Sequence, residues 1–595
     1  MGSVGETTYS VPHEAQNIFQ TEILNNPLVP SLPFGIKDAG NLVHFSGNDL
    51  PSIPINWRLA ESISALKAFE GSMLNVLRSR KYHVPMSKVD VNTDHASLYV
   101  MSPFLTKVVG KDGKEAKINV FDAGTMKDFG FPSTDLHNCA GQHRMLATNI
   151  YRTRDGRYYH CHGSMNPDPT LTALGLPAQG QEGDTYDSVV ERVQKVVAGI
   201  DSRELDHRMN EEYKQAGTIA WTTEEFAASE HGKANAHVGL YSLSRIDGQT
   251  QPAAWWPESA SMPSSASRPL AGLKVVDLTR VIAAPSITRG LAEMGASVMR
   301  ITTPKVTDMS GLHQDLNWGK WNAQLDLKSE EGREVLRGLI READVVVEGY
   351  RPGAMERNGF GREAIFELVR ERGWGIIHVR ENCYGWNGPW KHRSGWQQIS
   401  DAVSGHQLMS ARFPEAVMLT SMQCCGVSMK FGQAMGNDEA VTPVFPNSDY
   451  CTGVIGCAAV LHALIRRAEE GGSYGIDAAL NYYSQWLTNS VGEYPPPIWS
   501  DLRQRHGSPV FRHYHNMGYT LPAMFALLEK NASETLYRPE FFERRVSKAV
   551  GREFVQVKPV ARFADGVELG YHVGTRGNGV DRARWPEDLG REIVA

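Results

Sequence analysis

The sequence predicts an α/β protein with a Rossmann-like lobe built on a parallel sheet, smaller α+β lobes and a truncated N-terminal repeat. Apolar runs of strand length alternate with segments of helical period over residues 273–380. This βαβ order favours parallel strands joined by right-handed crossovers. A weak internal similarity between two distant parts of the chain indicates the repeat.

The alternating segment begins with an apolar run at residues 273–278, which predicts a strand. A helix from Pro285 to Met294 follows, because proline suits a first helical turn and Gly295 suits a C-terminal cap. The later elements are predicted as a strand at 296–301, a helix at 329–342, a strand at 343–348, a helix at 363–372 and a strand at 375–380.

The two similar segments, residues 66–91 and 454–479, share the order of an apolar helix, a polar turn and an apolar-acidic strand. The two segments align without a gap at an offset of 387 positions. In this alignment four residues are identical: Leu74 and Leu461, Leu77 and Leu464, Arg80 and Arg467, and Asp90 and Asp477. We therefore expect the two segments to form similar helix-turn-strand units.

The composition limits the classes of function. The 595 residues are 41% hydrophobic and 22% charged, as expected of a folded globular chain. Lys and Arg number 61 against 67 Asp and Glu, a net charge of -6, so we expect no nucleic-acid partner. Seven cysteines without a CxxC spacing favour free thiols in a reducing compartment.

Neither a signal peptide nor a membrane span is predicted. Residues 1–6 lack an apolar core. The longest uncharged apolar stretch, residues 450–465, is too short to cross a bilayer and is followed at once by two arginines. We therefore expect no membrane partner and a cytoplasmic location.

Several common sites are disfavoured by their motifs. No GxGxxG follows the first predicted strand, no GxxxxGK occurs, and no GxSxG elbow is present. His160, Cys161 and His162 alternate along one predicted strand, so the cysteine points away from the histidines and a fourth ligand is missing. We expect no metal site.

Residues 268–487 contain four short sequence blocks whose residues and order along the chain are informative together. They are Pro269-Leu-Ala-Gly-Leu-Lys-Val-Val-Asp-Leu-Thr279, Ala343-Asp-Val-Val-Val-Glu-Gly-Tyr-Arg-Pro-Gly353, Asp449-Tyr-Cys-Thr-Gly453 and Gly471-Gly-Ser-Tyr-Gly-Ile-Asp477. In these blocks the chain resembles the class III CoA-transferase family, also called the CaiB/BaiF family. Residues 66–91, 150–158 and 188–215 are similar only to the second lobe of that family.

The resemblance implies a fused, partly duplicated member. The predicted parts are an N-terminal extension at 1–50, a truncated CaiB/BaiF-like second lobe at 51–250, a Pro- and Ser-rich linker at 251–267, a Rossmann-like CoA-binding lobe at 268–445, and the second lobe with the C-terminal segment at 446–595. Family members are interlocked dimers. We therefore expect a homodimer, or an intrachain pseudo-dimer in which the fused lobe replaces part of the partner.

The resemblance also implies a reaction, the movement of CoA from an acyl-CoA donor to a carboxylic acid, with no tightly bound cofactor. An Asp before a helix in a DxxxG context is the nucleophile of the family, and Asp449 with Gly453 matches it. Its carboxylate would form an acyl anhydride and then an enzyme-CoA thioester. From the residues alone, Asp449 could equally be the N-cap of the apolar helix that follows.

Two other functions stay open. Racemases and epimerases of the same family use an Asp as base where this chain has Gln397, whose amide cannot accept the proton; Asp401, one helical turn on, is a weaker substitute. A non-catalytic acyl-CoA binding protein is the other alternative, because Ser62 replaces Asp449 in the first copy. Glu61 beside it is an unproven carboxylate.

For CoA binding, the resemblance implies residues after the first and third strands of the lobe. They are Val281, Ile282, Tyr350 and Arg357, with Lys320 and Arg351 as adjacent candidates. An arginine can hold phosphate oxygens with two parallel hydrogen bonds. Ordinary packing at a strand end is the alternative for Val281 and Ile282.

Overall fold

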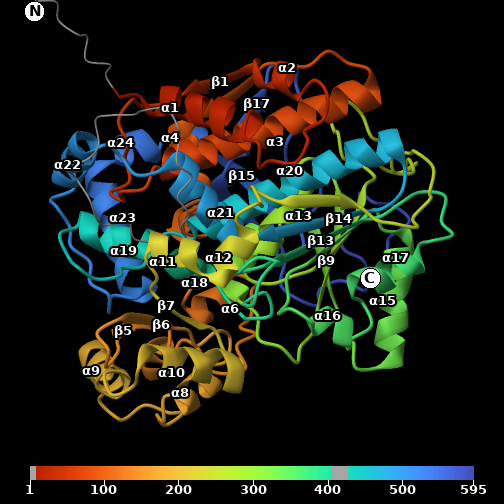
Figure 1. Ribbon diagram of the computed structural model, residues 1–595. Helices are drawn as coiled ribbons and strands as arrows, with labels where there is room; N and C mark the ends of the chain where they lie inside the picture. Colours follow the sequence, from red (N-terminus) through yellow and green to blue (C-terminus); the bar gives the residue numbers. More distant parts are fainter. Residues whose placement is uncertain (1–8, 404–425) are drawn as a thin grey trace, which may run out of the picture.

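The computed structural model describes residues 9–403 and 426–595, and a seven-stranded sheet lies at its centre (Figure 1). Its strands, in spatial order, are β11 (Lys320–Gln324), β10 (Ser297–Thr302), β9 (Lys274–Leu278), β12 (Val345–Glu348), β13 (Ile377–Asn382), β14 (Tyr474–Ala479) and β8 (Ser242–Arg245). The first six run parallel and β8 is antiparallel to β14. The Rossmann-like parallel sheet is confirmed.

Helices cover both faces of this sheet because successive side chains of its strands are buried on opposite sides. Val275 and Val379 pack in a core with helices α13 (Ala283–Glu293) and α20 (Asn447–Glu470). Val276 and Val346 pack on the other side, with helices α15 (Glu330–Glu342) and α17 (Arg362–Leu368). The continuous apolar runs of the sequence follow from this two-sided burial.

Strand β11 was not predicted, because its residues Lys-Trp-Asn-Ala-Gln are largely polar. The buried polar side chains of β11 are held mainly through ion pairs and hydrogen bonds, not through apolar contacts. Lys320 is fully buried and its ammonium lies 3.0 Å from the Asp277 carboxylate of β9, while Asn322 is buried beside Arg300. Buried ion pairs of this kind carry no hydrophobic signal in a sequence.

The internal repeat is visible in the order of elements. In the N-terminal copy, helix α3 (Leu59–Tyr82) leads to β2 (Val89–Asn92) and then α4 (Thr93–Tyr99). In the second copy, α20 leads to β14 and then α21 (Leu480–Trp486). Both long helices have 24 residues, and they pack on each other (Figure 1). The expected helix-turn-strand units are therefore present in both copies.

Three smaller sheets surround the centre. Strand β1 (Val43–Ser46) pairs with β2, and β2 with β17 (Ala561–Phe563). A small lobe contains the antiparallel sheet of β5 (Asn149–Arg152), β6 (Tyr158–Cys161) and β7 (Gly217–Ile219). The third small sheet is antiparallel and contains β15 (Phe542–Ser547), β16 (Arg552–Val557), β3 (Lys107–Val109) and β4 (Glu115–Lys117). The C-terminal strands thus complete sheets begun near the N-terminus, and the domain boundaries stay predictions.

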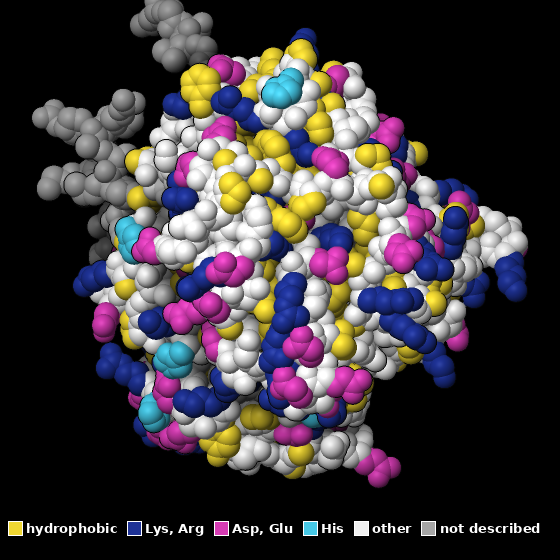
Figure 2. Space-filling model, turned by 90° about the vertical axis from the view of Figure 1, so that its right-hand side faces the viewer, with side chains coloured by type: hydrophobic (Ala, Val, Ile, Leu, Met, Phe, Trp, Pro, Cys, Tyr) yellow, Lys and Arg dark blue, Asp and Glu magenta, His cyan; other side chains and the backbone are white. Residues whose placement is uncertain are grey.

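Helix α20 is the one described helix whose length and apolar composition would allow it to cross a membrane, yet 94% of its most apolar 18-residue window is buried within the protein. It serves as a core helix. On the face shown in Figure 2, Lys and Arg side chains are interspersed with Asp and Glu, so neither sign of charge dominates that face.

The close approach of α20 to α13 depends on Gly453. A Cβ at this position would overlap the Cβ of Ser286 on α13. We expect Gly453→Ala to lower the free energy of unfolding by about 1–3 kcal/mol, the usual effect of overpacking. Chemical denaturation measures it.

Gly338→Ala is the matched control, because no atom lies within 4 Å of a Cβ placed there on α15. It should raise stability by about 0.5–1 kcal/mol, since Ala loses less backbone entropy in a helix. Equal stability changes in the two variants would contradict the packing of α13 on α20.

Candidate active site

A pocket opens at the carboxyl ends of β9, β12 and β13, where the strand order reverses between β9 and β12. Open α/β sheets bind ligands at such a point, because the loops after the two strands diverge there. The pocket encloses about 670 Å³, part of it open to solvent. Its lining comprises residues 280–283 after β9, 349–352 after β12, 381–383 at the end of β13, residues 393–396, Asp449 and Leu480.

Asp449 is the third residue of α20, and its half-buried side chain lines this pocket. Pro446 occupies the N-cap position, so the alternative that Asp449 caps the helix is wrong. Among residues 9–403 and 426–595, no group makes a hydrogen bond or ion pair with its carboxyl group. Burial raises the pKa of Asp449 well above its usual range, and the Glu381 and Asp401 carboxyls raise it further. The pocket therefore contains an unpaired carboxyl group.

Gln397, at the position of the racemase base, is buried and does not line the pocket. Its Nε2 donates to the Phe445 carbonyl at 2.7 Å and to Asp401 Oδ2 at 3.2 Å. Ser448 donates to the other oxygen of Asp401 at 3.0 Å. Asp401 is thus a hydrogen-bonded residue behind α20, and its side chain is not among those that face the pocket.

The predicted residues after β9 and β12 do meet in the pocket: Val281, Ile282, Tyr350 and Arg351 all line it. Val281 has φ of 74°, a left-handed conformation that a β-branched residue adopts only under strain. Such strain is concentrated at functional sites, where the surrounding structure holds it in place. The turn after β9 is therefore held in one shape against the pocket.

Cationic side chains form one side of the pocket. The Arg280 guanidinium lies 5.6 Å from the centre of the Tyr350 ring, and Arg351 donates to Gln215 Oε1 of the small lobe at 2.7 Å. Burial lowers the pKa of Arg351, and Arg280 lowers it further. Neither arginine makes an ion pair with a carboxylate among the described residues. An anionic ligand such as a phosphate would complete this side.

Two predicted residues lie elsewhere. Lys320 is the first residue of β11 and is fully buried; its ammonium pairs with Asp277 of β9 and donates to the Pro285 carbonyl of α13 at 2.9 Å. Burial lowers the pKa of Lys320 to about 8, although Asp277 favours its charged form. Arg357 ends the short helix α16 (Ala354–Arg357) and is exposed outside the pocket lining. The structure therefore does not place these two predicted residues in the pocket lining.

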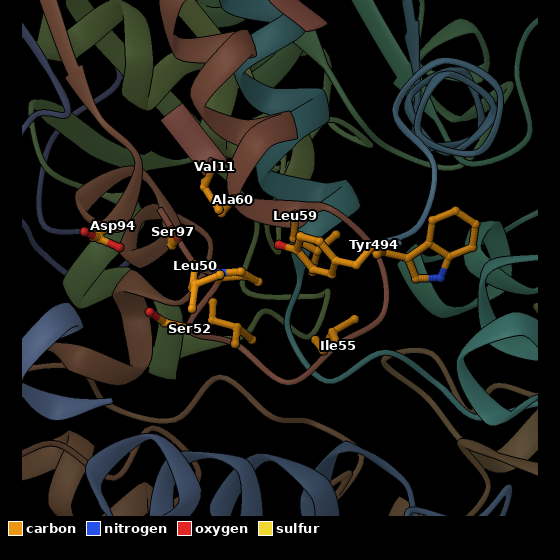
Figure 3. Close-up of a pocket in the computed structure, with 12 residues that line it drawn as sticks. Val11, Leu50, Ser52, Ile55, Leu59, Ala60, Asp94, Ser97 and Tyr494 are labelled. Carbon is orange, nitrogen blue, oxygen red and sulfur yellow. The ribbon is translucent and has the colours of Figure 1, made fainter. Parts of the chain in front are cut away.

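A second pocket occupies the corresponding place in the N-terminal copy, at the start of α3 and beside α4 (Figure 3). Leu50, Ile55 and Leu59 are among the side chains that line it. Its carboxyl group, Asp94, accepts hydrogen bonds from the backbone and side chain of Asn48. This pocket has both apolar and polar side chains in its lining, and its carboxyl group already has hydrogen-bond partners.

The two residues of interest in the first copy lie away from the Asp449 pocket. Glu61 is fully buried, accepts from Tyr494 at 3.0 Å and also bonds with Tyr9. Ser62 Oγ lies 3.0 Å from Tyr483 Oη, which accepts from the side chain of Asn447 at 2.5 Å. Ser62 thus contacts the network at the start of α20 and supplies no carboxylate.

The comparisons with known proteins assign this fold and its pocket to one enzyme family. The profile of CoA-transferase family III matches residues 270–515. The chain is 55% identical to the acetyl-coenzyme A transferase nodX of Hypoxylon pulicicidum over 98% of its length and 95% of that protein. It is 29% identical to an acyl-CoA transferase of Gibberella moniliformis, over 94% and 93% of the two chains.

A crystal structure of a CaiB/BaiF family protein from Brucella suis matches 36% of this chain and 53% of its own, with 24% identity and a TM-score of 0.28. The near full-length match to the Hypoxylon protein decides the family. The chain belongs to the class III CoA-transferase family, and it is a CoA-transferase.

Among the pocket residues that were not predicted from the sequence are Glu381, Cys383 and Trp396. The predicted strand ended at Arg380, while β13 continues to Asn382. Extending the alternation by one residue would have placed Glu381 on the buried face of Ile377 and Val379. An acidic residue in that position is the signal that could have found it.

Asp401 should make stability depend on pH. Burial raises the pKa of Asp401 to about 7, above the usual value that it has in the unfolded chain. The folded state therefore loses stability as pH rises from about 4 to about 7, because the buried group must ionise. We expect Asp401→Asn to be more stable than the wild type at pH 8, by about 4 kcal/mol, and to lose this advantage near pH 4.

Denaturant titrations at several pH values measure this difference. Asp112→Asn, at an exposed loop position, is the control and should leave stability within about 0.5 kcal/mol of the wild type at each pH. An advantage of Asp401→Asn that does not change with pH would show that Asp401 is not a neutral buried carboxyl group.

Proposed function

We propose that this CoA-transferase moves CoA from an acyl-CoA donor to a carboxylic acid through covalent intermediates on Asp449. The observation that carries the proposal is the carboxyl group of Asp449, unpaired among the described residues, in the pocket at the carboxyl ends of β9, β12 and β13. Structural carboxylates in protein interiors normally have partners. One without partners in an open pocket is available to a substrate.

The proposed chemistry balances without an external proton. The ionised carboxylate attacks the thioester carbonyl, which releases the CoA thiolate and leaves an acyl anhydride on Asp449. The thiolate then attacks the aspartyl carbonyl and releases the donor acid as a carboxylate. The acceptor carboxylate reverses these two steps through its own anhydride and leaves as the new acyl-CoA.

Val281, Ile282, Tyr350 and Arg351 are proposed to hold CoA, since they line the pocket beside Asp449. We retain Lys320 and Arg357 only as residues near that site. The name of the Hypoxylon relative favours acetyl-CoA as the first donor to test. The racemase alternative lacks its expected base, because the Gln397 amide lies outside the pocket lining, donates to the Phe445 carbonyl and cannot accept a proton from carbon.

We further propose that the N-terminal repeat makes a pseudo-dimer within one chain, which the packing of α3 on α20 supports. A homodimer would be a further level of assembly. A cytoplasmic location is proposed on the thiols, since Cys139, Cys161, Cys383, Cys451 and Cys457, the described cysteines, are all free.

The test is Asp449→Asn. The amide cannot form the anhydride, so we expect transfer from acetyl-CoA to a panel of acids to fall by at least about 1000-fold. The variant should fold with unchanged or higher stability, because a neutral amide replaces a buried carboxyl group whose pKa is raised. A coupled assay of CoA ester formation and a thermal melt measure the two effects.

Asp438→Asn, at an exposed position, is the matched control and should keep wild-type rates. Transfer that survives in Asp449→Asn would exclude Asp449 as the nucleophile. Binding of acetyl-CoA without transfer to any acid by the wild type would support the non-catalytic alternative.

A further inference from the structure

Glu381 is a buried carboxyl group in the same pocket as Asp449. It is the fifth residue of β13, and the alternation of the strand places it on the side of Ile377 and Val379, which pack with α13 and α20. Its side chain lines the pocket although the residue is only 9% exposed. A Cβ at Gly349 would lie 3.5 Å from its Oε2, so the carboxyl group lies against the end of β12.

The carboxyl group of Glu381 has no partner in the described part of the chain. No hydrogen bond or ion pair joins it to residues 9–403 or 426–595. The ionisable groups near it are Asp449 from α20 and Cys383, which follows β13. Asp401 from α18 (Gln397–Val403) interacts with those two groups in turn. Each is acidic, so none favours an ionised Glu381.

The arginines of the pocket are engaged elsewhere. Arg280 bonds the Thr307 carbonyl, and Arg351 bonds Gln215 and the Lys214 carbonyl. The Arg393 guanidinium pairs with Asp206 at 3.0 Å and Glu211 at 3.3 Å. Burial raises the pKa of Glu381 to about 8 and raises that of Asp449 as well. Two carboxyl groups in one pocket do not both ionise, so Glu381 holds the proton when Asp449 is the ionised nucleophile. In that form it is a hydrogen-bond donor whose side chain lines the same pocket as Asp449.

We propose that Glu381 is a further catalytic residue, which donates a hydrogen bond from its protonated carboxyl group to the acyl oxygen that becomes negative during attack by Asp449. This inference rests on the proposed function of Asp449. The proton stays on Glu381 throughout, so the balance of the reaction is unchanged. A donor that the protein already holds in position stabilises such an oxyanion more than freely reorienting water does.

The protonated form is essential for a second reason. Ionised Glu381 would offer no donor and would repel both the Asp449 carboxylate and the oxyanion. A buried carboxylic acid kept neutral near pH 7 so that it can donate a hydrogen bond is an established catalytic device in other enzymes. Transfer by the wild type should therefore decline above about pH 8 as Glu381 loses its proton.

Two substitutions at Glu381 test its hydrogen-bond donor and its ionisation separately. Glu381→Gln keeps the size and an N–H donor but cannot ionise, so kcat should stay within about tenfold of the wild type and the decline above pH 8 should disappear. Glu381→Leu removes the donor, so kcat should fall about 100-fold, the effect of losing one such donor, with KM for acetyl-CoA changed less than about threefold.

The measurements are pH profiles of transfer and a thermal melt for each variant. A decline above pH 8 that persists in Glu381→Gln would overturn the proposal, and so would wild-type kcat in Glu381→Leu. If Glu381→Leu does not fold, the pH profile of Glu381→Gln decides. Failure of this proposal leaves Asp449→Asn inactive, whereas transfer by Asp449→Asn would instead overturn the function on which it rests.

Discussion

Helix α20 is buried along nearly its whole length, and this burial fixes where the Asp449 carboxyl group can be. Gly453 and Gly456 bring α20 close to Ser286 and Ile287 of α13, so the helix cannot slide without a clash. At its start, Tyr450 Oη donates to Asp315 Oδ2 at 2.9 Å. The same oxygen accepts from Arg289 at 2.8 Å and Ser102 at 3.0 Å. The first turn of α20 is thereby held against the ends of the parallel strands.

The two copies of the repeat have diverged in their carboxyl groups. In the N-terminal copy Glu61 and Asp94 have hydrogen-bond partners, and Ser62 is joined to the start of α20 through Tyr483. In the second copy Asp401 has partners while Asp449 and Glu381 have none among the described residues. The carboxyl groups with hydrogen-bond partners hold elements of the fold together, whereas Asp449 and Glu381 line the pocket. The N-terminal copy thus supports the helix that carries the site.

Much of the fold was predictable because β9, β10, β12 and β13 are buried on both faces and therefore read as apolar runs. Strand β11 was hidden by the Lys320–Asp277 pair, since paired charges remove the hydrophobic signal. Asp449 was identified only through the family resemblance, because spacing alone could not separate a nucleophile from a cap. Glu381 was missed because the predicted strand ended at Arg380, two residues before the end of β13. The exposure of Arg357 depends on the short helix α16, which the sequence did not indicate.

The most direct test of the account is to find the covalent intermediate. The full chain is mixed with acetyl-CoA without an acceptor acid, treated with hydroxylamine to convert an activated carboxyl group into a hydroxamate, digested and analysed by mass spectrometry. The account predicts a hydroxamate on the peptide that contains Asp449, which depends on acetyl-CoA. Modification of Glu381 in place of Asp449, or an unmodified Asp449 in enzyme that transfers CoA under the same conditions, would contradict it.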